Sequence, residues 1–276
     1  MNITSPGLYP DIPEPTYHAD PVPAGSFSST MAKQILKSPA HLRHYLDSPR
    51  VEKAAFDFGH AVHAEVLGVG LEVEVMAFDS WRTKAAQTAR DEARAAGLVP
   101  LLEHEYEPVR RAVEAVRAHP IAGPLFAGAG LAEQSAFAVD PDTGLWLRAR
   151  FDWTTPGSIL VDLKTANDGA PQAFRRVVGD LGYDVQDAFY RHAYELATGE
   201  RPRGFIFVTV EKAAPHLVDV HELDADWQAL GRQKMRRAID TYKRCLDTGE
   251  WPGRPARVNT LSAPLWLIDQ EEEADD

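Results

Sequence analysis

The chain has 276 residues, of which 44% are hydrophobic, so it can bury a sizeable core as one elaborated domain or two small ones. It contains no run of 18 apolar residues, and its N-terminus lacks a basic region followed by an apolar one, so neither a membrane span nor a secretory signal is expected. Cys245 is the only cysteine, which excludes an intramolecular disulfide, disfavours a cysteine-bound zinc or iron–sulfur centre, and favours a reducing, cytoplasmic location.

The formal net charge of −12 argues against a surface that is basic throughout. The charge is unevenly spread, because residues 269–276 contain six acids and no base, which leaves −6 for the rest of the chain. A basic group at 232–237 is spaced around a predicted helix rather than along one face, so we predict no nucleic-acid contact from it. Acids that bind metal ions add negative charge without excluding an anionic substrate, so net charge does not decide the substrate.

The N-terminal part of the chain predicts an irregular arm followed by helices. Residues 1–25 contain six prolines, which favours an extended arm with little regular structure. Ser28 or Ser29 can cap a helix that carries Met31 and Ile35, and Pro39 suits the first turn of a second short helix. Further elements are expected at 71–78 (strand), 84–96 (helix), 103–119 (helix) and 122–126 (a helical turn).

The stretch 53–68 predicts a helix with a histidine on its apolar face. Phe56, Gly59, His63 and Leu67 recur at spacings of three or four residues and therefore share one face. On a helix taken alone, such a histidine is usually a core residue with a hydrogen-bond partner.

The C-terminal part predicts three strands, two helices, two strands and a long helix, which is a mixed α/β core preceded by a helical elaboration. The elements are expected at 131–139 (strand), at 145–164 (a run ending at Trp153, a turn at 155–157 and a second run containing 161–164), at 171–178 and 184–198 (helices), at 204–210 and 216–222 (strands), and at 224–246 (helix).

The second and third of these strands carry the candidate chemistry. Side chains alternate along a strand, so Asp162 and Lys164 point the same way while Leu163 points to the core. A hairpin with its turn at 155–157 brings Asp152 beside Asp162. Two carboxylates and a lysine on one surface suit phosphodiester hydrolysis with Mg²⁺ or Mn²⁺, which prefer oxygen ligands. The alternatives are an exposed Asp162–Lys164 ion pair and an Asp152 that caps the turn.

The motifs around this hairpin resemble the PD-(D/E)xK nuclease superfamily, and within it the phage-type exonuclease VIII (RecE-like) branch, related to lambda exonuclease and RecB-type nuclease domains. The resemblance covers roughly residues 26–245, and its set of spacings is more specific than any single motif. The matching stretches are Leu36-x-Ser38-Pro39-x-His41, Gly59-x-x-x-His63, His119-Pro120 followed by Glu133-Gln134-Ser135, Gly144 to Trp153, Val161 to Thr165, and Tyr183-Asp184-x-Gln186-x-x-x-Tyr190.

The resemblance implies an α/β (α+β) fold of the restriction-endonuclease type, in which helices flank a central mixed β-sheet and an N-terminal helical elaboration is added. It implies three regions: the arm at 1–25, a single nuclease domain at 26–255, and an acidic tail at 256–276 that is disordered at its end. A phage-encoded chain of this kind would act in the bacterial host cytoplasm.

The resemblance also implies roles for individual residues. The implied metal ligands, for one or two Mg²⁺ ions with Mn²⁺ as a substitute, are His63, Asp152, Asp162, the Leu163 carbonyl and Glu133, the last through a second metal or a water. Lys164 would be the catalytic lysine, acting with Asp152 and Asp162, and Gln186 and Tyr190 would orient it or bind DNA phosphate. The expected DNA contacts are Arg148, Arg150 and Arg191. From the residues alone, Glu133 could be merely solvated, and Gln186 and Tyr190 could be ordinary helix residues, with Tyr190 in the core.

The function implied is a metal-dependent deoxyribonuclease that digests linear duplex DNA from the 5′ end and leaves 3′ single strands for recombination or repair. A single-strand annealing protein is the implied partner, and a ring-shaped homo-oligomer the implied assembly. The alternatives are an endonuclease or a single-strand-specific nuclease of the same fold, and a non-catalytic scaffold that binds DNA or a partner.

Overall fold

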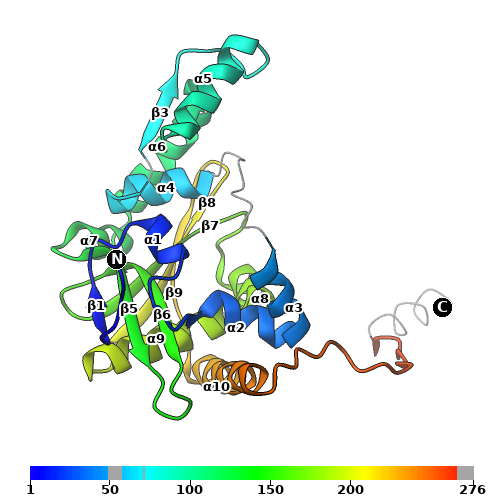
Figure 1. The fold of residues 1–276 in the computed structure, drawn as a ribbon. Helices are drawn as coiled ribbons and strands as arrows, with labels where there is room; N and C mark the ends of the chain where they lie inside the picture. Colours follow the sequence, from blue (N-terminus) through cyan, green and yellow to red (C-terminus); the bar gives the residue numbers. More distant parts are fainter. Residues whose placement is uncertain (49–57, 71, 266–276) are drawn as a thin grey trace, which may run out of the picture.

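The computed structural model describes residues 1–48, 58–70 and 72–265, and it is built around one seven-stranded mixed sheet (Figure 1). The strand order is β1-β5-β6-β7-β8-β9, with β2 paired to β6. The prediction of a mixed sheet flanked by helices is therefore confirmed. The strands are β1 (Gly7–Tyr9), β2 (Ser26–Ser28), β5 (Leu131–Val139), β6 (Trp146–Thr154), β7 (Ile159–Ala166), β8 (Gly204–Glu211) and β9 (Val218–Glu222).

Helices cover both faces of this sheet. On one face, α4 (Phe58–Leu67) and α6 (Glu103–Ala118) pack over Val161 and Leu163 of β7. On the other face, α9 (Tyr183–Thr198) packs over Phe151 and Leu160, and α10 (Ala225–Thr248) lies beneath α9 (Figure 1). Further helices of the body include α2 (Ser29–Lys37), α3 (Pro39–Asp47), α7 (Ala122–Ala127) and α8 (Pro171–Leu181).

One edge of β6 is shared by two strands, and this leaves an opening in the sheet. β2 pairs in parallel with residues 146–148 of β6, whereas β7 pairs antiparallel with Trp153 and Thr154. Between these two ladders, β6 and β7 diverge. Asp152 lies at the start of the divergence, so its side chain and the backbone of β7 are free to make other contacts.

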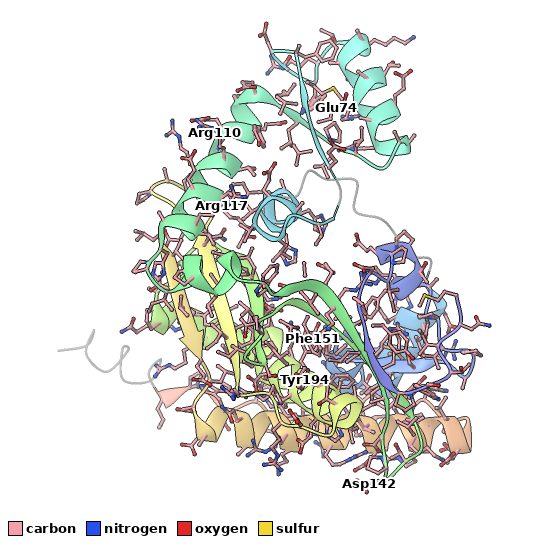
Figure 2. All side chains as sticks on the ribbon, turned by 90° about the vertical axis from the view of Figure 1, so that its left-hand side faces the viewer. Glu74, Arg110, Arg117, Asp142, Phe151 and Tyr194 are labelled. Carbon is pink, nitrogen blue, oxygen red and sulfur yellow. The ribbon has the colours of Figure 1, made fainter. Side chains whose placement is uncertain are left out.

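A small unit projects from the body next to α4. It consists of β3 (Val73–Met76), α5 (Lys84–Ala95) and β4 (Val99–Leu102), and the start of α6 continues from it. β3 and β4 form a two-stranded parallel sheet of their own. Figure 2 shows Glu74 and Arg110 in this region, well away from Phe151 and Tyr194 in the body. The strand β4 was not predicted, because its four residues include a proline and no alternating pattern.

The N-terminal 25 residues differ from the expected arm with little regular structure. β1 pairs antiparallel with β5 and so extends the central sheet, and α1 (Glu14–His18) follows it. Ile3, Ile12 and Tyr17 are buried against Phe137 of β5. Prolines restrict the backbone but leave the apolar side chains between them free to pack. Burial of these side chains therefore orders the segment despite its prolines. The division into arm, domain and tail remains a prediction.

Two predicted features fall outside the described residues. The expected helix 53–68 is observed as α4 from Phe58 to Leu67, and its expected start at 53–57 lies among residues that the structure does not describe. The acidic end of the tail, 266–276, is likewise outside it.

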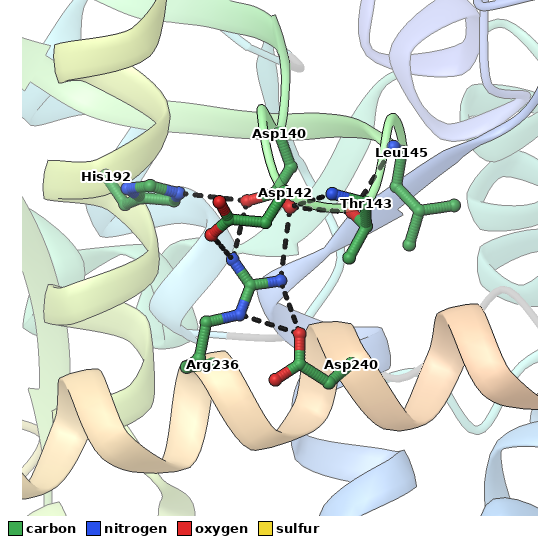
Figure 3. A network of polar contacts seen from close by, with 7 residues as sticks. All are labelled: Asp140, Asp142, Thr143, Leu145, His192, Arg236 and Asp240. Atoms are coloured by element: carbon green, nitrogen blue, oxygen red, sulfur yellow. Dashed lines mark hydrogen bonds and ion pairs between the residues drawn. The ribbon is translucent and has the colours of Figure 1, made fainter.

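A buried carboxylate ties the β5–β6 turn to α9 and α10 (Figure 3). Asp140 is fully buried and accepts hydrogen bonds from the Arg236 guanidinium at 2.8 and 3.1 Å and from the Thr143 hydroxyl at 2.6 Å. His192 of α9 lies 3.4 Å from the same carboxylate. Burial raises the pKa of Asp140, but the donors from Arg236 and Thr143 outweigh it and lower the pKa to about 2.

Replacing Asp140 by asparagine is expected to lower the free energy of unfolding at pH 7 by about 2 kcal/mol, the value of a pKa shift of this size. A folded-state pKa below the usual value of 3.8 gives stability that is present above pH 4 and lost as the pH falls toward 2. The difference between wild type and Asp140→Asn, from denaturant titrations, should therefore shrink over that interval. Asp142→Asn, an exposed carboxylate on the same turn, should change stability far less; an equal loss would refute this account.

Candidate active site

The candidate site is built at the opening between β6 and β7. The backbone N–H of Leu163 donates to Oδ2 of Asp152 at 2.8 Å, so the carboxylate replaces the ladder partner that β7 lacks there. Asp162 is only 2% exposed. Leu163 packs in the core beneath α4 and α6. The predicted alternation along β7 and the predicted approach of Asp152 to it are therefore both observed.

Glu133 reaches the site from the neighbouring strand. It lies across from Asp152, between the β5–β6 pairs Ala132–Trp153 and Gln134–Phe151. Its φ of +51° lies in the left-handed region, which costs a non-glycine residue roughly 1 kcal/mol or more. The ladder is interrupted at this residue, and the Glu133 carboxylate lies 3.6 Å from Nδ1 of His63 and 3.5 Å from Arg150.

His63 closes the site from α4. Its Nε2 lies 2.7 Å from Oδ2 of Asp152, so the ring bridges Asp152 and Glu133. Burial lowers the pKa of His63, but the charges of Asp152 and Glu133 outweigh this and raise it to about 9. The protonated ring balances the carboxylates at neutral pH.

Lys164 and Gln186 bind the other carboxylate. The Lys164 ammonium pairs with Oδ2 of Asp162, and the Gln186 amide of α9 donates to Oδ1 at 2.5 Å. Because Asp162 is buried, the pair is not the exposed ion pair considered as an alternative. Gln186 in turn accepts from Lys33 of α2 at 3.2 Å, so a chain of polar contacts runs from β7 through α9 to α2.

The site concentrates negative charge. Burial and the nearby Asp152 raise the pKa of Glu133 to about 6, and burial together with Asp152 also raises the pKa of Asp162, despite the Lys164 charge. The pKa of Asp152 is raised by burial but is lowered overall by His63. One ligand atom each from His63, Glu133 and Asp152 lies within 4.8 Å of the others. This donor set, two carboxylates and an imidazole with the Asp162 carboxylate nearby, fits a divalent cation.

Four of the predicted site residues make contacts that the prediction did not include. Tyr190 packs its ring against Phe151 and Phe205, while burial, with smaller contributions from Asp162 and Asp152, raises the pKa of its hydroxyl. Arg191 pairs with Asp187. Arg148 and Arg150 are 6% and 9% exposed.

These two arginines hold the N-terminal segment instead. Arg148 pairs with Asp20 and donates to the Ser26 hydroxyl at 2.8 Å, and Arg150 donates to the Ile12 carbonyl at 2.6 Å. Both guanidinium groups lie over the ring of Tyr17. That Arg148 and Arg150 contact DNA therefore stays a prediction, and their observed partners come from a segment expected to be an irregular arm.

Two residues of the site, Lys33 and Tyr183, were not among the predicted site residues. Lys33 and Lys164 both place their ammonium groups 5.1 Å from the ring centre of Tyr183, so the electron-rich ring interacts with both cations. Burial and the Lys164 charge lower the pKa of Lys33 to about 8. Tyr183 opens the matched motif on α9, which was a usable signal. Lys33 has no signal of its own, because a lysine on an amphipathic helix usually faces solvent.

The strand pair with its two aspartates and lysine, the histidine from a preceding helix and the glutamine from the following helix define a PD-(D/E)xK-type site on the corresponding fold. Residues 28–264 match the family described as "PDDEXK-like domain of unknown function (DUF3799)". The chain belongs to this family, and the resemblance to the PD-(D/E)xK superfamily is confirmed.

Among solved structures, the chain is similar to a putative exonuclease from Eubacterium rectale, with a TM-score of 0.63 and 12% identity over 94% of this chain and 98% of that one. At this identity the likeness concerns the fold. An alkaline exonuclease from Laribacter hongkongensis aligns over 69% of this chain and 91% of its own at 13% identity, but the TM-score of 0.27 carries no structural argument. No curated protein matches the sequence. None of the described helices is both long and apolar enough to cross a membrane.

Proposed function

We propose that the protein is a metal-dependent deoxyribonuclease, and specifically an exonuclease that digests linear duplex DNA in the 5′-to-3′ direction. The observation that carries the nuclease proposal is the placement of Asp152, Asp162 and Lys164 at one opening in the sheet, with His63 and Glu133 beside them. The direction of digestion and a role in recombination or repair rest on the resemblance to the exonuclease VIII branch. The same resemblance supports a ring-shaped oligomer and an annealing protein as partner.

The residues have separate roles in this proposal. His63, Glu133, Asp152, Asp162 and the carbonyl of Leu163 would hold one or two Mg²⁺ or Mn²⁺ ions. A bound ion would polarise the phosphodiester and lower the pKa of an attacking water. Lys164 orients that water and stabilises the charge that develops on the phosphate.

Gln186 and Lys33 support this arrangement from two helices. Gln186 fixes one oxygen of Asp162, so the other oxygen remains with Lys164. Lys33 donates to the oxygen of the Gln186 amide, and burial together with the nearby Lys164 charge lowers the pKa of Lys33 to about 8.

Replacing Lys33 by methionine is expected to lower kcat for DNA digestion by roughly 10-fold, because the Gln186 amide loses a charged donor worth about 1.4 kcal/mol. Lys33→Arg keeps a donor and should retain more activity. Steady-state release of acid-soluble nucleotides measures both variants. A full rate in Lys33→Met would show that Gln186 needs no second support.

Duplexes labelled at either the 5′ or the 3′ end test the proposed direction. With Mg²⁺, the 5′ label should be released first, as mononucleotides, while the 3′ label stays on a long strand. Early release of the 3′ label would reverse the assigned polarity. Digestion of closed circular DNA without a prior nick would instead identify an endonuclease, and digestion of single strands alone a single-strand-specific enzyme.

A further inference from the structure

The cations of α10 divide into two groups. Lys234 donates to Asp184 at 2.6 Å, and Arg236 pairs with Asp140, so these two hold the helix against the body. Arg237 and Arg244 have no ion-pair partner among the described residues. They are seven residues apart, with Thr241 between them, and so lie on one face of the helix. Within the basic group at 232–237, Lys234 and Arg236 therefore hold the helix against the body, whereas Arg237 is left without an ion-pair partner among the described residues.

The unpaired face of α10 lines a groove. The other walls are the C-terminal end of α2 and the chain segment 252–255, and the groove encloses about 350 Å³. Four cationic side chains line it, and no acidic residue does. The four are Lys37, Arg237, Arg244 and Arg254. The chain has a net charge of −12, and exposed arginines such as Arg110 pair with neighbouring glutamates, whereas no acidic side chain lines this groove.

Packed residues hold the groove in shape. Its floor includes Ile35 and Ala238, which are buried in the cluster between α2 and α10. The segment that carries Arg254 is fixed because the Ala40 N–H donates to the Pro252 carbonyl at 3.2 Å. The Trp251 ring packs against Tyr242, 6.1 Å between ring centres. The cations are therefore mounted on a preformed surface.

Helix α2 contributes to both the groove and the candidate active site. Lys33 contacts Gln186 within the site, and Lys37 lies one helical turn further on, about 6 Å along the axis. DNA presents a phosphate about every 3.4 Å of rise along each strand, so a strand bound at the active site has further phosphates to offer at this distance.

We propose that this groove binds the backbone phosphates of the DNA substrate outside the position that is cleaved. The inference rests on the proposed DNA substrate but not on hydrolysis. The contacts would be independent of base sequence, because guanidinium and ammonium groups on this surface meet only the charged backbone. They would retain the substrate while successive bonds are cut.

The salt dependence of duplex binding tests the groove without any cleavage. In the Lys164→Ala background, the affinity for a fluorescent 20-base-pair duplex is measured by anisotropy across a series of salt concentrations. Adding Arg237→Gln and Arg244→Gln together should reduce the slope of log affinity against log salt by about 2, since each phosphate contact contributes about 0.9. The matched control is Arg110→Gln with Arg111→Gln, two exposed arginines on α6 that pair with Glu107. It changes the charge equally and should leave the slope unchanged.

The outcomes separate this inference from the proposed function. An unchanged slope in the groove variant, or an equal fall in the control, overturns the groove even if wild type digests DNA. A reduced slope in the groove variant alone supports it even if wild type proves not to cleave. Absence of duplex binding overturns it as well. Both double variants replace exposed arginines by glutamine. Melting curves establish that the variants fold as the parent protein does.

Discussion

The Lys164→Ala variant is expected to lose roughly 10²–10³-fold in kcat for digestion of linear duplex DNA, the usual effect of removing one positioned charge from a transition state. Lys164 is held by Asp162 on one side and by the ring of Tyr183 on the other, so its ammonium group is preorganised. Initial rates of nucleotide release in Mg²⁺ give the comparison. The matched control is Lys243→Ala, an exposed lysine of α10 paired with Asp247, which should keep the wild-type rate.

The Lys164→Ala variant leaves the buried Asp162 carboxylate without its cation, which could destabilise the fold. A loss of activity in this variant is therefore interpretable only if the protein is folded. Lys164→Met preserves the length of the side chain and provides a second test. Thermal unfolding of both variants should show a folded protein at the assay temperature. Wild-type rates in either folded variant would remove Lys164 from the mechanism.

The Asp152→Asn variant is expected to weaken Mg²⁺ or Mn²⁺ binding by at least about 100-fold, beyond the 10–100-fold that loss of a supporting residue costs. Asn keeps an oxygen that can accept from the Leu163 N–H, so the local backbone has a substitute partner. It removes the charge that His63 and a metal ion would share. Calorimetric titration of the metal, with duplex DNA present, measures the effect.

Asp142→Asn serves as the control for this titration, because that carboxylate is exposed on the β5–β6 turn, away from the cluster of His63, Glu133 and Asp152. It should bind metal as wild type does. Equal affinity in Asp152→Asn and wild type would place the metal elsewhere.

The sequence predicted those parts of the site that depend on short-range geometry. Alternation along a strand put Asp162 and Lys164 on one face, and the hairpin was expected to bring Asp152 beside Asp162; in the structure Asp152 accepts from the adjacent Leu163 N–H. Helical spacing placed His63 on an inward face, although only the resemblance assigned it to the site. The contact with Asp152 agrees with that assignment.

The parts that could not be predicted depend on distant segments of chain. The left-handed backbone of Glu133 is set by its position opposite Asp152, and no residue type signals it. Lys33 reaches Gln186 across 153 positions. Arg148 and Arg150 resembled free cations on a strand, but the N-terminal segment supplies Asp20 and the Ile12 carbonyl to them.

The N-terminal segment thus shapes the site indirectly. Arg150 contacts both Ile12 and Glu133, so the buried segment and the candidate metal ligand share one guanidinium. Packing of Tyr17 against the same group fixes its position. A change in this segment would therefore reach Glu133 through a single side chain.

The most direct test of metal-dependent hydrolysis at this hairpin compares wild type with Asp162→Asn, purified identically, on linear duplex DNA. Phosphodiester bonds cut per enzyme are counted with Mg²⁺, with Mn²⁺ and with a chelator. We predict digestion by wild type with either metal, none with the chelator, and a loss of at least about 10²-fold in Asp162→Asn. Equal digestion by the two proteins, or digestion that persists in the chelator, would contradict the assignment of the site.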